Sequence, residues 1–107
     1  MKRILVLLSL LTTAMVHASG KVDFLEVDKG IVSFSTVEAK TATSPACVAS
    51  ETANLWTVTL ASETGRATYT MLMTALSTGV PVKVESAGDC AYMAGLERAS
   101  RVWFENE

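Results

Sequence analysis

The chain of 107 residues has only one histidine, His17, and only two cysteines, and just 19% of its residues are charged. His17 lies in an N-terminal segment that we expect to be removed on export. The remaining chain then has no histidine for a Ser-His-Asp triad, a Cys-His pair or a His-ligated zinc site. It also has no G-x-S-x-G elbow, S-x-x-K motif or glycine-rich phosphate loop. We therefore expect no catalytic residues, no metal site and no cofactor.

Positive charge is scarce and dispersed. Without residues 1–18, seven basic residues stand against eleven acidic ones, which gives a formal net charge near −4. A protein that follows a phosphate backbone needs clustered lysine and arginine. We therefore expect no nucleic-acid partner, and we interpret the acidic balance as the ordinary surface charge of a small secreted domain.

The longest apolar run stands near the N-terminus. Two basic residues precede thirteen uncharged, mostly apolar residues, and a Val-His-Ala tripeptide then offers signal peptidase small or branched side chains. This pattern predicts a secretory signal peptide over residues 1–18, cleaved between Ala18 and Ser19, and one small domain over residues 19–107. The alternative is an uncleaved membrane anchor, but a helix of that run would span only about 20 Å of a hydrocarbon core of about 30 Å.

The location and the covalent framework follow from the predicted export. No later stretch is long and apolar enough to cross a bilayer, so we expect a periplasmic or secreted bacterial protein without membrane contact after cleavage. Cys47 and Cys90 can form only one intramolecular pair, and an oxidising compartment favours a disulfide between them. The alternative is a redox pair, but reactive dithiols usually lie close together as Cys-x-x-Cys, and Asp89 would raise the pKa of the neighbouring thiol.

The first part of the mature chain predicts a β-hairpin. Residues 20–27 are typical of a strand, and the break in alternation at Phe24 and Leu25 predicts a β-bulge there. Residues 28–30 form a short turn with a glycine, and residues 31–37 form the returning strand. A polar loop follows.

The second part contains a strand, a helix and two further strands. Residues 47–49 are compatible with a short strand or strand edge, and residues 54–60 alternate as a half-buried strand does. Ser62 is the expected N-cap of a helix of about 14–17 residues, which ends at Gly79. Strands over residues 80–85 and 97–105 complete the pattern. The side of the helix that we expect to face the core carries Ala67, Met71, Leu72, Ala75 and Leu76.

This order predicts a mainly β fold with one helix. A helix between the third and fourth of five strands is the order of the OB-fold, a small, partly open Greek-key barrel. An unrelated α+β sandwich could give the same order, so this alternative stays open. The fold that we expect is a five-stranded OB-like barrel with one disulfide.

Several spaced motifs carry a resemblance to known proteins. They comprise Gly20-Lys21-Val22 with Leu25 and Val27, Ile31-Val32-Ser33-Phe34, Cys47, Trp56-Thr57-Val58-Thr59-Leu60, Ala75-Leu76-Ser77-Thr78-Gly79, Val82-Lys83-Val84 and Gly88-Asp89-Cys90. Together they resemble a group of small exported bacterial proteins, mostly uncharacterised. More distantly, the chain is similar to the pentameric B subunits of subtilase-type toxins. The resemblance implies an OB-like fold, export and a bridge between Cys47 and Cys90, and the toxin branch adds glycan binding and ring assembly.

Aromatic side chains provide the candidate binding residues. Tyr92 lies in the loop beside Cys90, and Trp103 stands next to Phe104 in the last strand, so these two face opposite sides of the sheet. Exposed aromatic rings stack against sugars or pack into interfaces. The alternative for Trp103 is a structural role at one end of the barrel.

The helix also offers a second apolar side. Tyr69 and Met73 are expected to point away from the core-facing side, and such a second side indicates a neighbour, for example another copy of the chain.

These observations favour an exported, non-enzymatic binding or interaction module with a glycan or protein ligand, which could form a homo-oligomer. The alternative is a small periplasmic accessory or structural protein without a small-molecule ligand. A hydrolase with an unrecognised site ranks last, because no pair of carboxylates is singled out by its spacing.

Overall fold

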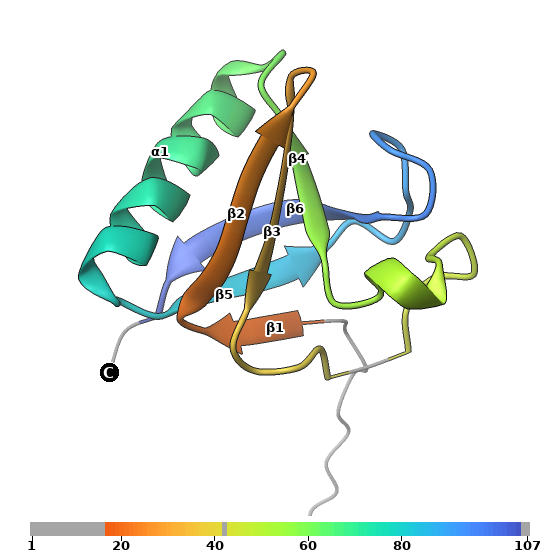
Figure 1. Cartoon of the computed structure of the whole chain (residues 1–107), viewed down its shortest axis with the longest axis horizontal. Coiled ribbons are helices and arrows are strands. Elements are labelled where there is room, and N and C mark those ends of the chain that lie inside the picture. The colour runs from red at the N-terminus through yellow and green to blue at the C-terminus, as the bar shows by residue number, and fades with distance from the viewer. Residues whose placement is uncertain (1–16, 42, 106–107) are drawn as a thin grey trace, which may run out of the picture.

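The computed structural model describes residues 17–41 and 43–105 and contains one curled sheet and one long helix (Figure 1). Residues 1–16, which make up most of the predicted signal peptide, lie outside the described residues. The elements are β1 (His17–Gly20), β2 (Val22–Asp28), β3 (Ile31–Thr36), the short 3-10 helix η1 (Ser50–Thr52), β4 (Trp56–Thr59), α1 (Glu63–Thr78), β5 (Val82–Ser86) and β6 (Glu97–Phe104).

The sheet has the strand order β1-β5-β6-β4-β3-β2. Neighbouring strands are antiparallel except β4 and β6, which are parallel. The two outermost strands, β1 and β2, are separated along the chain by Lys21 alone, so the ends of the sheet are brought together. A hydrogen bond of 2.8 Å from the Val37 backbone N–H to the Lys21 carbonyl strengthens this junction. The sheet is therefore curled into a barrel-like shape (Figure 1).

The structure corrects the expected strand count from five to six. The additional strand, β1, pairs with β5 and includes His17 and Ala18, which the sequence pattern assigned to the signal peptide. Gly20 ends this strand with a φ of 107°, a conformation that glycine adopts at little cost, and the chain turns there before β2 begins. The bond between Ala18 and Ser19, at which we expect cleavage, lies within β1.

The predicted hairpin is confirmed. Lys29 and Gly30 have φ values of 54° and 80°, and this two-residue turn pairs Asp28 with Ile31. The bulge lies slightly earlier than the break at Phe24 and Leu25 suggested, because the register shifts between Val22 and Phe24. The Ser35 hydroxyl donates a hydrogen bond of 2.6 Å to the carboxylate of Asp23, the extra residue of the bulge.

The predicted helix is confirmed, including both ends. The Ser62 hydroxyl accepts the backbone N–H of Gly65 at 2.9 Å, and Gly79 ends the helix in the left-handed conformation. The side that faces the core differs from the expected one. Leu72 and Ala75 are buried as expected, whereas Leu76 and Ala67 are exposed, and Tyr69 packs against the core.

A close contact between α1 and β4 explains why Tyr69 faces the core. Gly65 is buried, and a Cβ atom at its position would lie 1.6 Å from the Thr59 carbonyl oxygen. The first turn of α1 therefore rests directly on the backbone at the end of β4, which directs the Gly65 side of the helix inward. Tyr69 lies one turn further along this side and packs against the core, whereas Leu76 lies near the C-terminal end of the helix and is 47% exposed.

Two of the remaining predicted strands form and a third does not. The strands predicted over residues 80–85 and 97–105 correspond to β5 and β6, and Val82 and Val84 are fully buried as expected. The short strand considered for residues 47–49 does not form. This segment instead makes a turn, with a hydrogen bond from Val48 to Pro45, and continues into η1.

The hydrophobic core fills the space between the curled sheet and α1. Its buried residues are Val22, Val32, Phe34, Trp56, Val58, Leu72, Ala75, Val82, Val84, Ala99 and Val102. The helix packs mainly against β2 and β4, and in Figure 1 the loops that carry the two cysteines lie at the opposite side of the view from α1. No helix within the described part of the chain combines the length and the apolar character that crossing a membrane requires.

Candidate functional site

The parallel pair of β4 and β6 opens into a cleft. The two strands pair only at Trp56 with Glu97 and at Thr57 with Arg98, and beyond these residues they separate. The first turns of α1 bridge the gap. The resulting cleft has a volume of about 250 Å³. Its lining residues are Val58, Thr59, Ser62, Thr64, Gly65, Thr68, Tyr92, Arg98, Ala99, Ser100, Arg101 and Val102.

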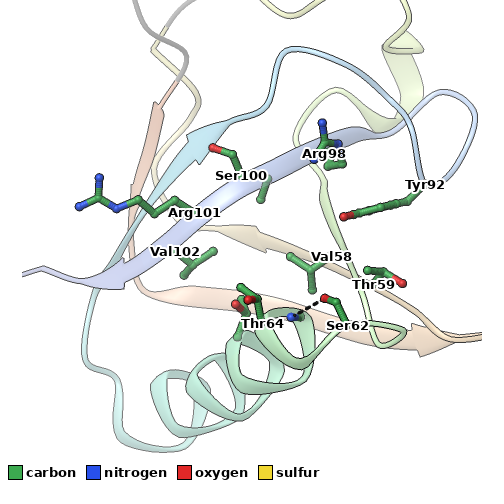
Figure 2. A pocket seen from close by; sticks show the side chains of 12 residues that line it. Val58, Thr59, Ser62, Thr64, Tyr92, Arg98, Ser100, Arg101 and Val102 are labelled. Atoms are coloured by element: carbon green, nitrogen blue, oxygen red, sulfur yellow. Dashed lines mark hydrogen bonds between the residues drawn. The ribbon is translucent and has the colours of Figure 1, made fainter.

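The cleft is apolar at its centre, and residues with hydroxyl groups surround that centre (Figure 2). Val58 and Val102 come from the two diverging strands. Five lining residues carry hydroxyl groups on their aliphatic side chains, and none of the lining residues is acidic. These residues are Thr59, Ser62, Thr64, Thr68 and Ser100, and the hydroxyl of Ser100 donates to the Glu85 and Ser86 carbonyl oxygens of β5, which leaves the other four to face the cleft. A lining of this kind can exchange hydrogen bonds with an uncharged polar ligand and cover its less polar face.

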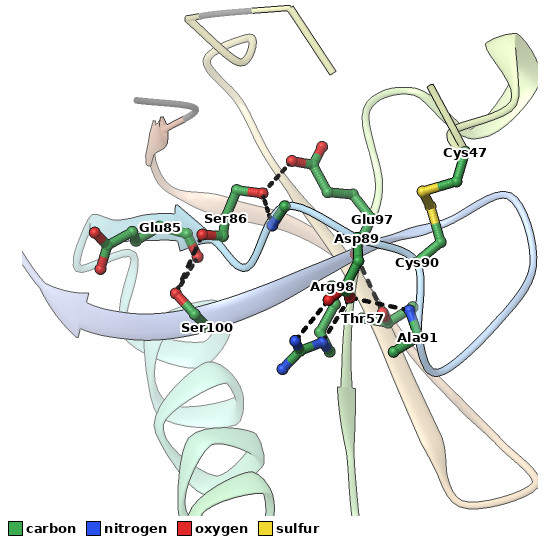
Figure 3. Close-up of polar contacts among 11 residues, drawn as sticks. Cys47, Thr57, Glu85, Ser86, Asp89, Cys90, Ala91, Glu97, Arg98 and Ser100 are labelled. Atoms are coloured by element: carbon green, nitrogen blue, oxygen red, sulfur yellow. Dashed lines mark hydrogen bonds and ion pairs between the residues drawn. A yellow bond between two sulfur atoms is a disulfide. The ribbon is translucent and has the colours of Figure 1, made fainter. Parts of the chain in front are cut away.

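Tyr92 stands at one side of the cleft, where Arg98 and Asp89 hold it in place. The Arg98 guanidinium carbon lies 5.4 Å from the centre of the Tyr92 ring, within the range of a cation–π contact. The same guanidinium donates two hydrogen bonds to the Asp89 carboxylate, at 2.7 and 2.8 Å (Figure 3). This bidentate geometry fixes the orientation of the arginine better than a single contact would.

The ion pair changes the titration of both groups. Hydrogen bonding from Arg98 lowers the pKa of the Asp89 carboxyl to about 2, partial desolvation opposes this change, and the backbone N–H of Ala91 adds to the lowering. The pKa of Arg98 is raised above its usual range, mainly by the hydrogen bond to Asp89. The pair therefore stays ionised at any pH at which the fold is expected to operate.

A disulfide between Cys47 and Cys90 anchors the loop that carries Tyr92. Its Cα–Cα distance is 6.1 Å, and it confirms the predicted pairing (Figure 3). The far end of the same loop is tied to the η1 region, because the Gly95 carbonyl accepts the Ala49 backbone N–H at 3.0 Å and the Thr52 hydroxyl at 2.7 Å. Tyr92 therefore lies in a loop that is fixed at both ends.

A buried ion pair lies at the start of β6. The Lys40 ammonium is 2.8 Å from the Glu97 carboxylate, and the two side chains are 7% and 0% exposed. Lys40 also donates to the Leu55 carbonyl at 2.9 Å and lies 4.1 Å from the centre of the Trp56 ring. Burial lowers the pKa of Lys40, and the hydrogen bond and charge of Glu97 partly offset this effect.

The carboxylate of Glu97 has a second partner. The Ser86 hydroxyl donates to its other oxygen, as Figure 3 shows. Since both carboxylate oxygens are bonded and the ammonium is largely covered, this cluster is suited to joining the loop at Lys40 to β5 and β6, and its atoms are poorly placed to meet a ligand.

The two predicted binding residues have different positions. Tyr92 lines the cleft, whereas Trp103 does not. Trp103 is half-buried on β6, and the Arg101 guanidinium lies 4.2 Å from the centre of its ring. The Arg101 side chain extends away from the other lining residues (Figure 2). The hydrophobic core contains Phe104 at its margin and does not contain Trp103.

Among the lining residues, Tyr92 is the one that the sequence analysis named, and Arg98, which holds it, is the most important of those that it did not name. In the sequence Arg98 is one of several scattered basic residues. A signal for it did exist, because Asp89 and Arg98 flank the loop that contains Cys90 and Tyr92. Opposite charges at the two ends of a short loop can pair when its ends meet.

A second hollow lies near the junction of β1 and β2. It has a volume of about 460 Å³ and is lined by Gly20, Lys21, Val37, Glu38, Pro81 and Glu105. It is more open to solvent than the first cleft, and none of its lining residues is aromatic. We therefore take the cleft at Tyr92 as the candidate binding site.

Comparisons with known proteins leave the function to be argued from this geometry. The chain matches no protein-family model, no curated protein and no solved structure. Within residues 17–41 and 43–105, no group of three or more histidine, cysteine, aspartate or glutamate residues is arranged to hold a metal ion.

Proposed function

We propose that this protein is an exported, non-enzymatic binding module and that the cleft between β4, β6 and α1 binds a glycan. The observation that carries this proposal is the position of Tyr92, which lies at a hydroxyl-lined cleft and is held by Arg98 and the disulfide-anchored loop. The proposal includes an OB-like barrel and the distant relationship to toxin B subunits that the sequence resembles.

The strand order supports the OB-like assignment. If β1 and β2 are counted as one strand interrupted at Lys21, five strands remain, and α1 connects the third to the fourth. The third and fifth of these strands, β4 and β6, form the parallel pair, and all other neighbours are antiparallel. Such an arrangement is expected of a small, partly open Greek-key barrel.

The covalent framework supports export. A disulfide forms and persists in an oxidising compartment, and the Cys47–Cys90 bridge is consistent with the periplasm or the extracellular medium. We propose that the signal peptide is cleaved between Ala18 and Ser19. Mass spectrometry of protein recovered from the periplasm or the medium should then show Ser19 as the first residue, and an intact Met1 would contradict this.

The chemistry of the cleft favours a sugar. A pyranose ring has an apolar face that stacks on an aromatic side chain and hydroxyl groups that exchange hydrogen bonds around its edge. Tyr92 can provide the aromatic surface, and the threonine and serine side chains can provide the surrounding hydrogen bonds. A volume of about 250 Å³ is small for a drug-sized ligand and suits one sugar unit of a longer chain.

Glycan binding is tested with two single-residue variants on a glycan array. Tyr92→Ala removes the aromatic surface at the cleft. Phe24→Ala is a matched control, because the two aromatic side chains are similarly exposed, at 38% and 42%, and Phe24 does not line the cleft. We expect wild-type protein and Phe24→Ala to bind the same glycans, and Tyr92→Ala to bind them at least about tenfold more weakly, in line with the loss of about 1.5 kcal/mol of stacking.

The same experiment separates the alternatives. Binding that Tyr92→Ala and Phe24→Ala reduce equally would contradict the assignment to this cleft. If no glycan binds, and a pull-down from periplasmic extract instead recovers a specific protein, the accessory role becomes the better account of this protein.

A further inference from the structure

Two arginines line the candidate cleft, and each makes contacts that use its charge. The Arg98 guanidinium donates two hydrogen bonds to the Asp89 carboxylate, at 2.7 and 2.8 Å (Figure 3). This bidentate pair compensates the positive charge of Arg98 at the place where the cleft meets Tyr92. Asp89 itself does not line the cleft, so the cleft meets the cationic side of the pair and has the anion behind it.

The second arginine, Arg101, directs its charge away from the cleft. Its guanidinium carbon lies 4.2 Å from the centre of the Trp103 ring, and its Nη1 atom lies 4.0 Å from the Glu85 carboxylate. The side chain extends away from the other lining residues (Figure 2). Since neither Trp103 nor Glu85 lines the cleft, the guanidinium has its partners outside the cleft.

The start of α1, which also borders the cleft, is compensated in its turn. The N-terminus of a helix attracts anions because its backbone N–H groups and its dipole are positive there. In α1 the Ser62 hydroxyl accepts the Gly65 backbone N–H at 2.9 Å, and Glu63 places a carboxylate in the first turn. None of the residues that line the cleft is acidic. The cleft therefore contains no strong uncompensated charge of either sign.

We propose that the cleft selects uncharged sugars over acidic ones, and that Asp89 is the residue that determines this selectivity. The inference rests on the proposed glycan site and specifies its ligand as a neutral pyranose. An acidic sugar that enters the cleft gives up part of the hydration of its carboxylate, and no cation there is free to replace that hydration. A neutral sugar gives up only the hydration of its hydroxyl groups, which the hydroxyl groups of the lining can replace.

Removal of the Asp89 charge should shift the preference towards acidic sugars. Asp89→Asn keeps an oxygen that can accept the Ala91 backbone N–H, which Asp89 binds at 3.1 Å, so the loop can retain this contact. The Arg98 guanidinium stays protonated but loses its counter-charge, and it becomes available to a carboxylate in the cleft. The side chains of Arg98 and Asp89 are 28% and 46% exposed, so water screens the freed charge and we expect a change of about tenfold.

A glycan array with three versions of each terminal sugar measures this selectivity. The probes are oligosaccharides that end in a hexose, in the matching uronic acid, or in the methyl ester of that acid, which has no charge. We expect wild-type protein to bind the hexose and the ester at least about tenfold more strongly than the acid.

The same array compares two variants that each lose one negative charge. Asp89→Asn should raise the ratio of acid binding to hexose binding at least about tenfold, and added salt should reduce this gain. Glu26→Gln is the matched control, because Glu26 is exposed on β2, does not line the cleft and is separated from β4 by β3. We expect Glu26→Gln to keep the wild-type ratio. A ratio is compared because a general loss of binding or of folded protein cancels in it.

The possible results separate this inference from the glycan proposal. The inference is overturned if wild-type protein binds the acid as strongly as the hexose, or if Asp89→Asn and Glu26→Gln give the same ratio. In both cases sugars still bind, so the glycan proposal survives. If wild-type protein binds neither the hexose nor the acid, the glycan proposal fails and this inference fails with it. The comparison of acid with ester requires no substitution, so it tests the selectivity even where Asp89→Asn is unstable.

Discussion

Replacement of Lys40 by methionine should be among the most damaging single substitutions in this protein. The change retains most of the side-chain volume but removes the ammonium group, which lies 2.8 Å from Glu97 and 2.9 Å from the Leu55 carbonyl. The Glu97 carboxylate is completely buried and, among the described contacts, would retain the hydroxyl of Ser86 as a partner. Removal of one member of a buried ion pair typically destabilises a protein by about 3–5 kcal/mol.

This loss is large compared with the stability expected of the domain. Small domains unfold with a free energy of about 5–15 kcal/mol, so Lys40→Met would remove a large share of it. Urea denaturation at pH 7, followed by tryptophan fluorescence, measures the change. The double variant Lys40→Met/Glu97→Leu removes both charges and should recover most of the lost stability, because no uncompensated charge is left in the interior.

The double variant provides an independent check. A loss below about 1 kcal/mol for Lys40→Met at pH 7, or a double variant that stays as unstable as Lys40→Met, would refute this account of the ion pair.

Three further predictions concern the structure around the cleft. Gly65→Ala should destabilise the protein by about 1–3 kcal/mol because the new Cβ would clash with the Thr59 carbonyl, even though alanine favours helices by up to about 1 kcal/mol. Chemical denaturation measures the change in the free energy of unfolding, and a stabilised variant would contradict the contact. Cys90→Ser should lower the free energy of unfolding by about 4 kcal/mol, as expected for a closed loop of this length, and the double variant with Cys47→Ser should lose the same amount. In an NMR titration Asp89 should have a midpoint at about pH 2, so its stabilising contribution is complete above its unfolded pKa of about 3.9 and is lost as the pH falls towards 2. Arg98→Gln should move the titration midpoint of Asp89 up towards 3.9, whereas the control Arg66→Gln should leave it unchanged. An Asp89 midpoint that is the same in Arg98→Gln and in wild-type protein would contradict the ion pair.

Local chemistry explains which parts of the fold could be predicted from the sequence. The helix ends are set by a serine whose hydroxyl accepts a backbone N–H three residues later and by a glycine that tolerates a positive φ, so Ser62 and Gly79 are recognisable without tertiary information. The hairpin turn at Lys29 and Gly30 is equally local. The disulfide follows from the presence of only two cysteines and from the predicted export.

Features that depend on contacts between distant segments could not be predicted in this way. The inward position of Tyr69 depends on the approach of Gly65 to Thr59, and no property of the helix by itself indicates that Tyr69 packs against the core while Leu76 is exposed. The strand β1 escaped prediction because His17 and Ala18 belong to a pattern that signal peptidase reads.

The candidate site shows the same limit. Tyr92 is a candidate from the sequence because it lies in the loop beside Cys90 and exposed aromatic rings stack against sugars or pack into interfaces. The partners that hold it could not be predicted, since Arg98 acquires its role only when the loop brings Asp89 back to β6. The buried pair of Lys40 and Glu97 joins residues 57 positions apart, and each resembles an ordinary surface residue in the sequence.

The most direct test of the proposed function is to map the binding surface by NMR. Backbone amide shifts of uniformly labelled protein would be recorded during titration with the glycan that gives the strongest array signal. The account predicts that the largest changes occur at the residues around the cleft, from Ser62 to Gly65, at Tyr92 and from Arg98 to Val102. Changes that centre instead on Trp103 or on Met73 and Leu76 of α1, or an array without any glycan signal, would contradict it.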